Sequence, residues 1–156
     1  MYSNNLICDI LIYIDDNIGN KIAIEDLEKR FFYNRYYIMK LFKKEMNITL
    51  INYINSIRIY RSITLIKETS NNLLNIAFKC GFYSIEYFSE TFRKITGVNP
   101  QVAKSYLRNK KNINQKEINI LNKSITDIYS LITFKNKYLL RRKPNILPTK
   151  KLTIFK

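Results

Sequence analysis

Tyr36, Met39 and Lys40 are spaced so that a helix would place them within one turn of each other on a single face. Side chains of these types could contact the edges of DNA bases: lysine donates to guanine O6 and N7, and tyrosine and methionine can touch thymine methyl groups. Three nearby cations suit phosphate oxygens, which add affinity but no sequence information: Arg35, Lys43 and Lys44. The alternative is an ordinary solvated helix face.

A second set of side chains, about fifty residues further on, has a different balance of charge. Four of them would share a face suited to base edges: Ile85, Glu86, Ser89 and Glu90. Two basic residues that suit phosphates follow them: Arg93 and Lys94. Glutamate can accept a hydrogen bond from cytosine N4, but carboxylates beside phosphates weaken affinity. We therefore expect the first set to dominate base recognition and the second mainly to position the protein on DNA.

Both sets lie in segments with one shared pattern: a short helix, a tight turn with a capping residue, and a second helix ending in a basic pair. The first unit covers about 24–46 and the second about 73–96. An offset of 50 residues aligns Asn34 with Ser84, Ile38 with Phe88, Phe42 with Phe92 and Asn47 with Gly97. Asn and Ser can accept a hydrogen bond from an unpaired N–H of the following helix. The pattern is typical of helix-turn-helix units, so we expect a monomer that contacts two successive major grooves of double-stranded DNA.

The other elements predict an all-α fold in which a linker helix joins the two units. Residues of about 50–68 are apolar on two faces, which is typical of a helix packed between neighbours. At 1.5 Å per residue this helix spans ~28 Å, comparable with the ~34 Å between successive major grooves. A helix over about 5–17 precedes the units and a short helix begins at Pro100, so we place the DNA-binding domain at 5–108.

Residues 109–156 form a basic C-terminal extension. Residue 104 onward contributes 14 Lys or Arg and 2 Asp or Glu to a chain of net charge +15, although codon drift toward lysine is another source of part of this charge. Such a region would attract DNA phosphates with a strong dependence on salt. Apolar residues at 3,4 spacing predict a helix over about 115–134 that either docks on the core or dimerises. After it we expect an irregular segment, which is disordered, a hairpin or a DNA-clasping arm.

The reactive residue types are too few for catalysis. Cys8 and Cys80 are the only cysteines and histidine is absent, so we expect buried reduced thiols, no catalytic residue, no metal and no cofactor. A DNA-repair enzyme would need more cysteines than these two. The first residues lack a basic leader, and no apolar run nears the ~20 residues of a membrane span. We therefore expect no signal peptide, no membrane contact and a cytoplasmic location at the bacterial nucleoid.

The stretch from about Ile7 to Arg108 resembles the DNA-binding domain of AraC/XylS-type transcription activators, in particular the small MarA/SoxS-like members. The most specific match is Ile76-Ala77-x3-Gly81-Phe82-x-Ser84-x2-Tyr87-Phe88-Ser89-x2-Phe92-Arg93-Lys94-x2-Gly97-x2-Pro100. Further matches are Phe42-Lys43-Lys44, Tyr53-Ile54 and Arg58. The resemblance implies a bacterial activator that recruits RNA polymerase, without the ligand-sensing domain of longer relatives.

The chain also departs from the family's pattern. It has Ala23 for a Ser or Thr cap, Glu28 for a small residue, Phe32 for a turn glycine, Glu90 for a basic residue and Ala103-Lys104 for an aromatic-Arg pair. For the tyrosines at the starts of the second helices, we favour core or interface positions for Tyr37 and Tyr87 and leave Tyr33 open. Two other functions stay possible: a non-specific DNA or RNA binder, and an interaction module that keeps the fold without specific recognition.

Overall fold

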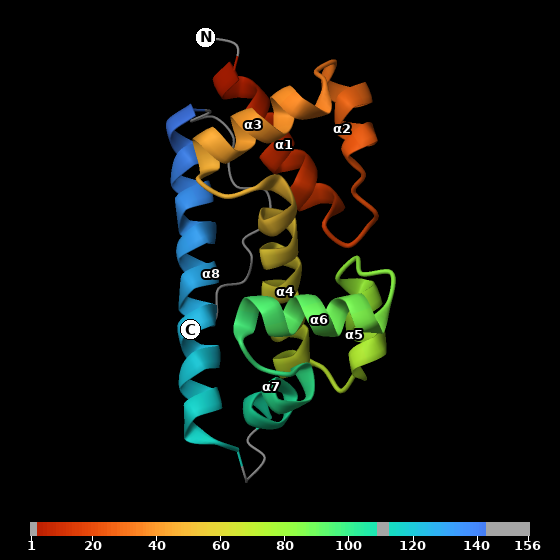
Figure 1. Ribbon diagram of the computed structural model, residues 1–156, viewed down its shortest axis with the longest axis vertical. Helices are drawn as coiled ribbons and strands as arrows, with labels where there is room; N and C mark the ends of the chain where they lie inside the picture. Colours follow the sequence, from red (N-terminus) through yellow and green to blue (C-terminus); the bar gives the residue numbers. More distant parts are fainter. Residues whose placement is uncertain (1–2, 109–112, 143–156) are drawn as a thin grey trace.

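The computed structural model describes residues 3–108 and 113–142 as α-helices and connections, and no strand occurs in these two ranges. The elements are α1 (Ser3–Asn17), α2 (Ile24–Phe31), α3 (Arg35–Met46), α4 (Leu50–Glu68), α5 (Leu73–Lys79), α6 (Ile85–Thr96), α7 (Pro100–Leu107) and α8 (Gln115–Arg142). The predicted all-α fold is confirmed. Figure 1 shows α1–α3 stacked above α5–α7, with α4 and α8 running along the long axis beside them.

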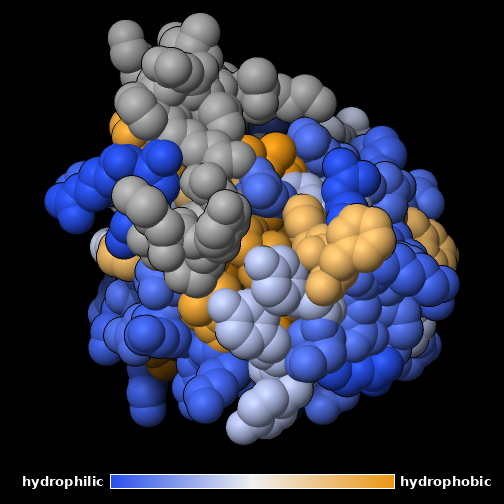
Figure 2. Space-filling model, turned by 90° about the horizontal axis from the view of Figure 1, so that it is seen from above, coloured by the Kyte–Doolittle hydropathy of each residue, from blue (hydrophilic) through white to orange (hydrophobic). Residues whose placement is uncertain are grey.

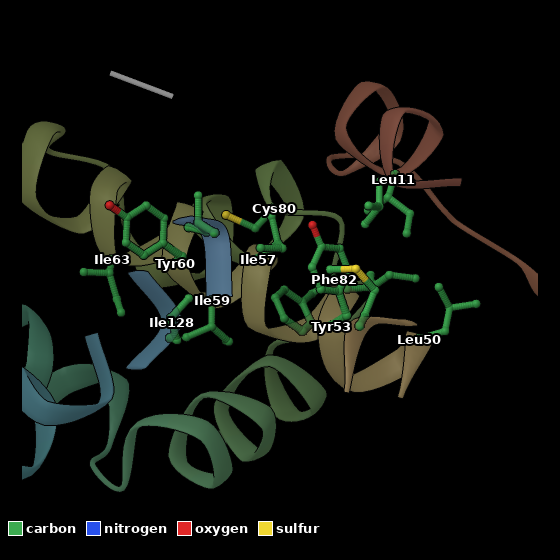
Figure 3. Packing of buried hydrophobic residues seen from close by; sticks show 14 of the residues in the cluster. Leu11, Leu50, Tyr53, Ile57, Ile59, Tyr60, Ile63, Cys80, Phe82 and Ile128 are labelled. Carbon is green, nitrogen blue, oxygen red and sulfur yellow. The ribbon is translucent and has the colours of Figure 1, made fainter. Parts of the chain in front are cut away.

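Helix α4 forms the centre of the core, as its two apolar faces predict. Helices α3, α5, α6, α7 and α8 all pack against it. Its buried side chains meet side chains from three other parts of the molecule in Figure 3: Leu11 of α1, Cys80 and Phe82 of the α5–α6 turn, and Ile128 of α8. One continuous core therefore holds both helix-turn-helix units, and α4 is shared between them.

The predicted caps of the two second helices are confirmed. The Asn34 side-chain oxygen accepts a hydrogen bond from the Tyr37 N–H (2.9 Å), and the Ser84 hydroxyl accepts one from the Tyr87 N–H (3.1 Å). At the other ends, Asn47 and Gly97 both adopt the left-handed conformation, with φ of 57° and 77°. Each cap residue thus pairs a backbone group that the helix itself leaves unpaired.

The turns of the two units differ from each other. In the first unit Phe32 is the left-handed residue (φ 60°), and its side chain is 91% exposed. In the second unit Gly81 takes this conformation (φ 86°), and the following Phe82 is buried. Left-handed geometry is unfavourable for a residue with a Cβ. The departure from glycine at Phe32 is therefore accommodated with backbone strain and without compensating burial.

Helix α8 continues to Arg142, so the expectation of irregular structure after residue 134 is wrong for 135–142. In the sequence, Lys135 looks like the start of a polar tail. Its ammonium instead lies 2.7 Å from a carboxylate oxygen of Asp15, and the Lys135 side chain is 4% exposed. Leu131, Ile132 and Tyr138 continue the inward face around it. Residues 143–156, where a hairpin or arm was considered, lie outside the described part of the chain.

Helix α8 docks on the core of its own chain, which is the first of the two alternatives, docking or dimerisation, that the sequence left open. Helix α8 packs against α1, α4, α6 and α7, and its inward face buries Leu121, Ile128 and Ile132. Two of the apolar residues of the predicted seam, Leu121 and Ile128, thus contact the core of their own chain. The seam is thereby used within one molecule.

Cys8 and Cys80 are buried and neither forms a disulfide, as predicted. Burial raises the pKa of the Cys80 thiol to about 12, so it stays protonated at neutral pH. Among residues 3–108 and 113–142, no group of three or more His, Cys, Asp or Glu side chains could hold a metal ion. No helix in these ranges is long and apolar enough to cross a membrane.

Candidate nucleic-acid interface

Helix α3 has a buried face and an exposed face, and the predicted base-contacting residues lie on the exposed one. Tyr36 is 73% exposed and Met39 38% exposed, and the Lys40 ammonium lies 5.9 Å from the centre of the Tyr36 ring. The opposite face buries Ile38, Leu41, Phe42 and Met46 in the core. The structure thus presents Tyr36, Met39 and Lys40 together to solvent, with the exposed Lys43 and Lys44 one turn further along.

Arg35 has a different environment from the one expected of a phosphate ligand. Its guanidinium lies 3.3 Å from a Glu25 carboxylate oxygen and 3.2 Å from one of Glu28. The Arg35 backbone N–H also donates to Glu28 at 2.6 Å. These contacts join the start of α3 to α2 across the turn. Glu28, a departure from the family's pattern, therefore supports the first unit's geometry and partly neutralises the cation.

Helix α6 exposes a mixed set of charges. Glu86, Glu90, Arg93 and Lys94 are exposed, while Ile85 and Ser89 are half-buried. Within the described residues no lysine or arginine lies within 4 Å of either glutamate. Glu86 lies in the first turn, where the helix dipole favours a carboxylate. The two acidic side chains are thus not paired with a basic side chain of the described residues, and Glu86 also has a structural reason to be acidic.

A pair of stacked tyrosines stands at the start of each of these two helices. The rings of Tyr33 and Tyr37 are 5.1 Å apart and nearly parallel (20°), and those of Tyr83 and Tyr87 are 5.2 Å apart (14°). The pairs are related by the same offset of 50 residues. Sequence reasoning missed them as pairs and left Tyr83 out, although the repeat itself carried the signal.

The two pairs differ in their surroundings. The Asn55 side-chain amide donates to the Tyr87 hydroxyl (3.1 Å), which confirms an interface position against α4. Tyr37, in contrast, is 39% exposed, so its assignment to a core or interface position is wrong. Its ring stacks on that of Tyr33, which is itself exposed. With the exposed Phe32, Tyr36 and Met39, this end of the molecule carries several apolar groups, and Figure 2 shows such groups among the hydrophilic surface.

The two exposed helix faces belong to one arrangement. In Figure 1, α3 and α6 cross the front of the molecule in the same direction, each running from its turn at the right toward α8 at the left. Helix α4 runs from the level of α3 past that of α6 and packs against both. Two second helices that run in the same direction on one side of a shared core are suited to successive grooves of the same duplex.

A comparison with known proteins shows which family has this architecture. Residues 27–106, which include both second helices, match a family described as a helix-turn-helix domain. A solved regulator of the AraC-type DNA-binding class from Chromobacterium violaceum has the same fold, with a TM-score of 0.60 at 22% identity over 69% of this chain and 96% of that one. The chain belongs to the AraC family.

AraC-family relatives share the region of the two units. The transposon Tn10 TetD protein of Escherichia coli is 30% identical over 109 residues, which cover 70% of this chain and 77% of TetD. The melibiose operon regulatory protein of Escherichia coli is 32% identical over 95 residues, 61% of this chain but only 32% of its own length. The family makes the protein a DNA-binding transcription regulator. Helix α8 lies beyond the residues that match the AraC-family domain.

Proposed function

We propose that this AraC-family protein binds two half-sites in successive major grooves as a monomer and activates transcription by recruiting RNA polymerase in the bacterial cytoplasm. One observation carries the proposal: a single core holds α3 and α6 on the same side of the molecule, with their polar faces exposed. The activator role follows the relatives, among them the transcriptional activator AarP of Providencia stuartii, 25% identical over 65% of this chain and 75% of its own length.

In this proposal α3 reads bases. Lys40 donates to guanine O6 and N7, while Tyr36 and Met39 contact thymine methyl groups on either side. Lys43 and Lys44 bind phosphates beyond the end of this face. Arg35 serves mainly to hold the turn, because Glu25 and Glu28 already occupy its guanidinium. The exposed Phe32 and stacked Tyr33 and Tyr37 flank the same helix and add apolar surface next to the duplex.

In this proposal α6 mainly positions the protein on the duplex and adds less to the affinity than α3 does. Arg93 and Lys94 bind phosphates, while Ile85, Glu86, Ser89 and Glu90 face the second groove. A carboxylate there accepts from cytosine N4 only where the site offers it, and elsewhere it is repelled by phosphates. The basic C-terminal extension, residues 109–156, supplies attraction that α6 lacks, through counterion release.

In-vitro selection of duplexes bound by the full chain, followed by titration at two salt concentrations, tests this function. We expect the selected duplex to bind ~10³-fold or more tightly than a scrambled duplex, as specific regulators do. We also expect two conserved half-sites about one helical turn apart. Equal affinity for both duplexes, with only the salt-dependent part of binding left, would indicate a non-specific binder instead. An absence of any DNA binding would indicate an interaction module.

Replacing both acidic residues of α6, as Glu86→Gln with Glu90→Gln, is expected to raise affinity for every duplex by ~3- to 10-fold, because two charges that repel phosphates disappear. The measurement is the same titration at low and high salt, and the gain should shrink at high salt. Glu68→Gln with Asp16→Asn is the matched control, since it changes the net charge equally at exposed positions of α4 and α1. An equal gain in the control would assign the effect to net charge and not to the position of α6.

A further inference from the structure

Helix α8 touches both helix-turn-helix units although it lies outside the AraC-family domain. It packs on α1 of the upper layer, on α6 and α7 of the lower layer, and on α4 between them. In Figure 1 it stands along the left side over most of the height of the molecule, where the C-terminal ends of α3 and α6 point. The contacts at its two ends show how closely it is tied to both recognition helices.

At its C-terminal end, α8 is held by two polar contacts with buried donors, one to α1 and one to α3 of the first unit. The buried Lys135 ammonium pairs with Asp15 of α1 at 2.7 Å. The Tyr138 hydroxyl donates to the carboxylate of Glu45, which lies in the last turn of α3, at 3.0 Å. Burial and this donation both raise the pKa of Tyr138, so the hydroxyl keeps its proton over the physiological range. A buried ammonium without a partner is strongly unfavourable, so the position of α8 against α1 is specific.

At the second unit, α8 contacts the end of α6. The Ser124 hydroxyl donates to the carbonyl of Thr96, the last residue of α6, at 3.1 Å. Ile120 lies so close over Gly97 that a Cβ there would be 2.5 Å from the Ile120 Cγ2. Nearby, the Asn122 amide donates to the Tyr106 hydroxyl of α7 at 3.3 Å. Residues 120 and 138 are separated along the helix by ~27 Å at 1.5 Å per residue, a span similar to that of α4.

On the opposite side, Arg58 of α4 links the two units, and the α1–α2 connection also approaches the α5–α6 turn directly, since a Cβ on Gly81 would lie 2.6 Å from the Ile18 carbonyl oxygen. Arg58 donates to the carbonyls of Ile18 (3.2 Å) and Asn20 (2.7 Å) in the α1–α2 connection. Its guanidinium also lies over the ring of Phe82 in the α5–α6 turn (5.8 Å). In Figure 1 these two connections approach each other at the right edge, away from α8. With α8 detached, the units could pivot about this contact and α4; with α8 in place, both edges are fixed.

We propose that α8 sets the distance and rotation between α3 and α6 and so determines which half-site spacing the protein accepts. Lys135, Tyr138, Ser124 and Ile120 are then positioning residues that act on DNA through the recognition helices. This inference rests on the proposed function, since both helices must engage DNA. Two linked modules gain ~10²- to 10⁴-fold over one only where the geometry lets both bind at once. When α3 and α6 are held in a fixed arrangement, the affinity for DNA therefore depends on the spacing between the two half-sites.

The experiment compares Lys135→Met with Tyr138→Phe, as one double variant, against the matched control Lys137→Met with Tyr129→Phe. Both pairs remove the same charge and one hydroxyl from α8, but Lys137 and Tyr129 are exposed. Each protein is titrated with the selected two-half-site duplex and with versions that carry one or two base pairs inserted or removed between the half-sites. We expect wild type and control to lose ~10-fold or more with each change of spacing, and the variant to lose less than ~3-fold.

The outcomes separate the inference from the proposed function. No preference for the selected over the scrambled duplex would overturn the proposed function itself. A clear preference with the same spacing profile in variant, control and wild type would overturn the role of α8 alone, as would a wild type indifferent to spacing. Circular dichroism checks that the variants are folded. If the double variant unfolds, Tyr138→Phe against Tyr129→Phe gives the same comparison with the Lys135–Asp15 pair intact.

Discussion

The triple variant Tyr36→Ala, Met39→Ala, Lys40→Ala is expected to lose ~10³-fold in affinity for its selected duplex, because good base contacts are each worth ~1–3 kcal/mol. The three side chains share the exposed face of α3, whereas the buried face is formed by Ile38, Leu41, Phe42 and Met46, which the variant keeps. Affinity for a scrambled duplex is expected to fall only by the loss of one cation.

Fluorescence titration with both duplexes at one salt concentration measures the two losses. Lys29→Ala on α2 is the control for charge, because Lys29 is exposed but lies outside the second helix of its unit. Lys29→Ala should lower the affinity for both duplexes slightly and to the same extent. Met39→Leu should retain most of the specific affinity, since the apolar contact with a thymine methyl survives. Equal losses for selected and scrambled duplexes in the triple variant would show that α3 binds phosphates without reading bases.

The local features of the fold could be predicted because each depends on few residues. Asn34 and Ser84 cap their helices through their own side chains, and Gly97 ends α6 with the positive φ that glycine allows. Pro100 begins α7 for an equally local reason. The 50-residue repeat and the two apolar faces of α4 then determine the arrangement, because a helix buried on both faces needs neighbours on both sides.

The features that were missed depend on residues far apart in the chain. Lys135 looks like part of a polar tail until Asp15, 120 residues away, is placed against it. Arg35 looks like a free cation until the turn brings Glu25 and Glu28 to it. Spacing on one helix identifies which side chains share a face, but not which of them a neighbouring helix already occupies. The sequence thus predicted which helix face carries the candidate site. It predicted only in part which charged side chains on that face are not already paired within the protein.

The tyrosine pairs show a third case, in which the signal was present in the sequence. Tyr33 and Tyr37 share a helix start four residues apart, and Tyr83 and Tyr87 repeat this spacing in the second unit. A residue type conserved between two internal copies is more informative than either copy alone. In each pair the first tyrosine directly precedes the cap residue and the second lies in the first turn of the helix, and the two rings stack across the cap.

Gly81→Ala is expected to cost ~3 kcal/mol or more of the free energy of unfolding. A left-handed residue with a Cβ is disfavoured by ~1–2 kcal/mol before any contact is considered. At Gly81 (φ 86°) the new Cβ would also lie 2.6 Å from the carbonyl oxygen of Ile18 and 3.0 Å from the Arg58 guanidinium. The Ile18 oxygen is backbone and cannot rotate away, so the α1–α2 connection must shift.

That shift has consequences beyond the turn. The Ile18 carbonyl accepts from Arg58, whose second contact is with Asn20, so moving the connection breaks the buried arginine's hydrogen bonds. Burial lowers the pKa of Arg58, because desolvation disfavours its charged form, so the loss of hydrogen bonds to this guanidinium would be costly. Urea unfolding followed by circular dichroism measures the loss as a lower midpoint at unchanged slope.

Phe32→Gly provides a control of opposite sign in the first unit. Phe32 has the same left-handed backbone (φ 60°) but is 91% exposed, so glycine relieves ~1–2 kcal/mol of strain while adding ~0.5–1 kcal/mol of chain entropy to be lost on folding. The net expectation is a small gain in stability. The free energy of unfolding of Gly81→Ala could instead lie within ~0.5 kcal/mol of the wild-type value. The two units would then approach each other less closely at Arg58 than the geometry indicates. The hinge about which α8 is proposed to fix them would then lie elsewhere.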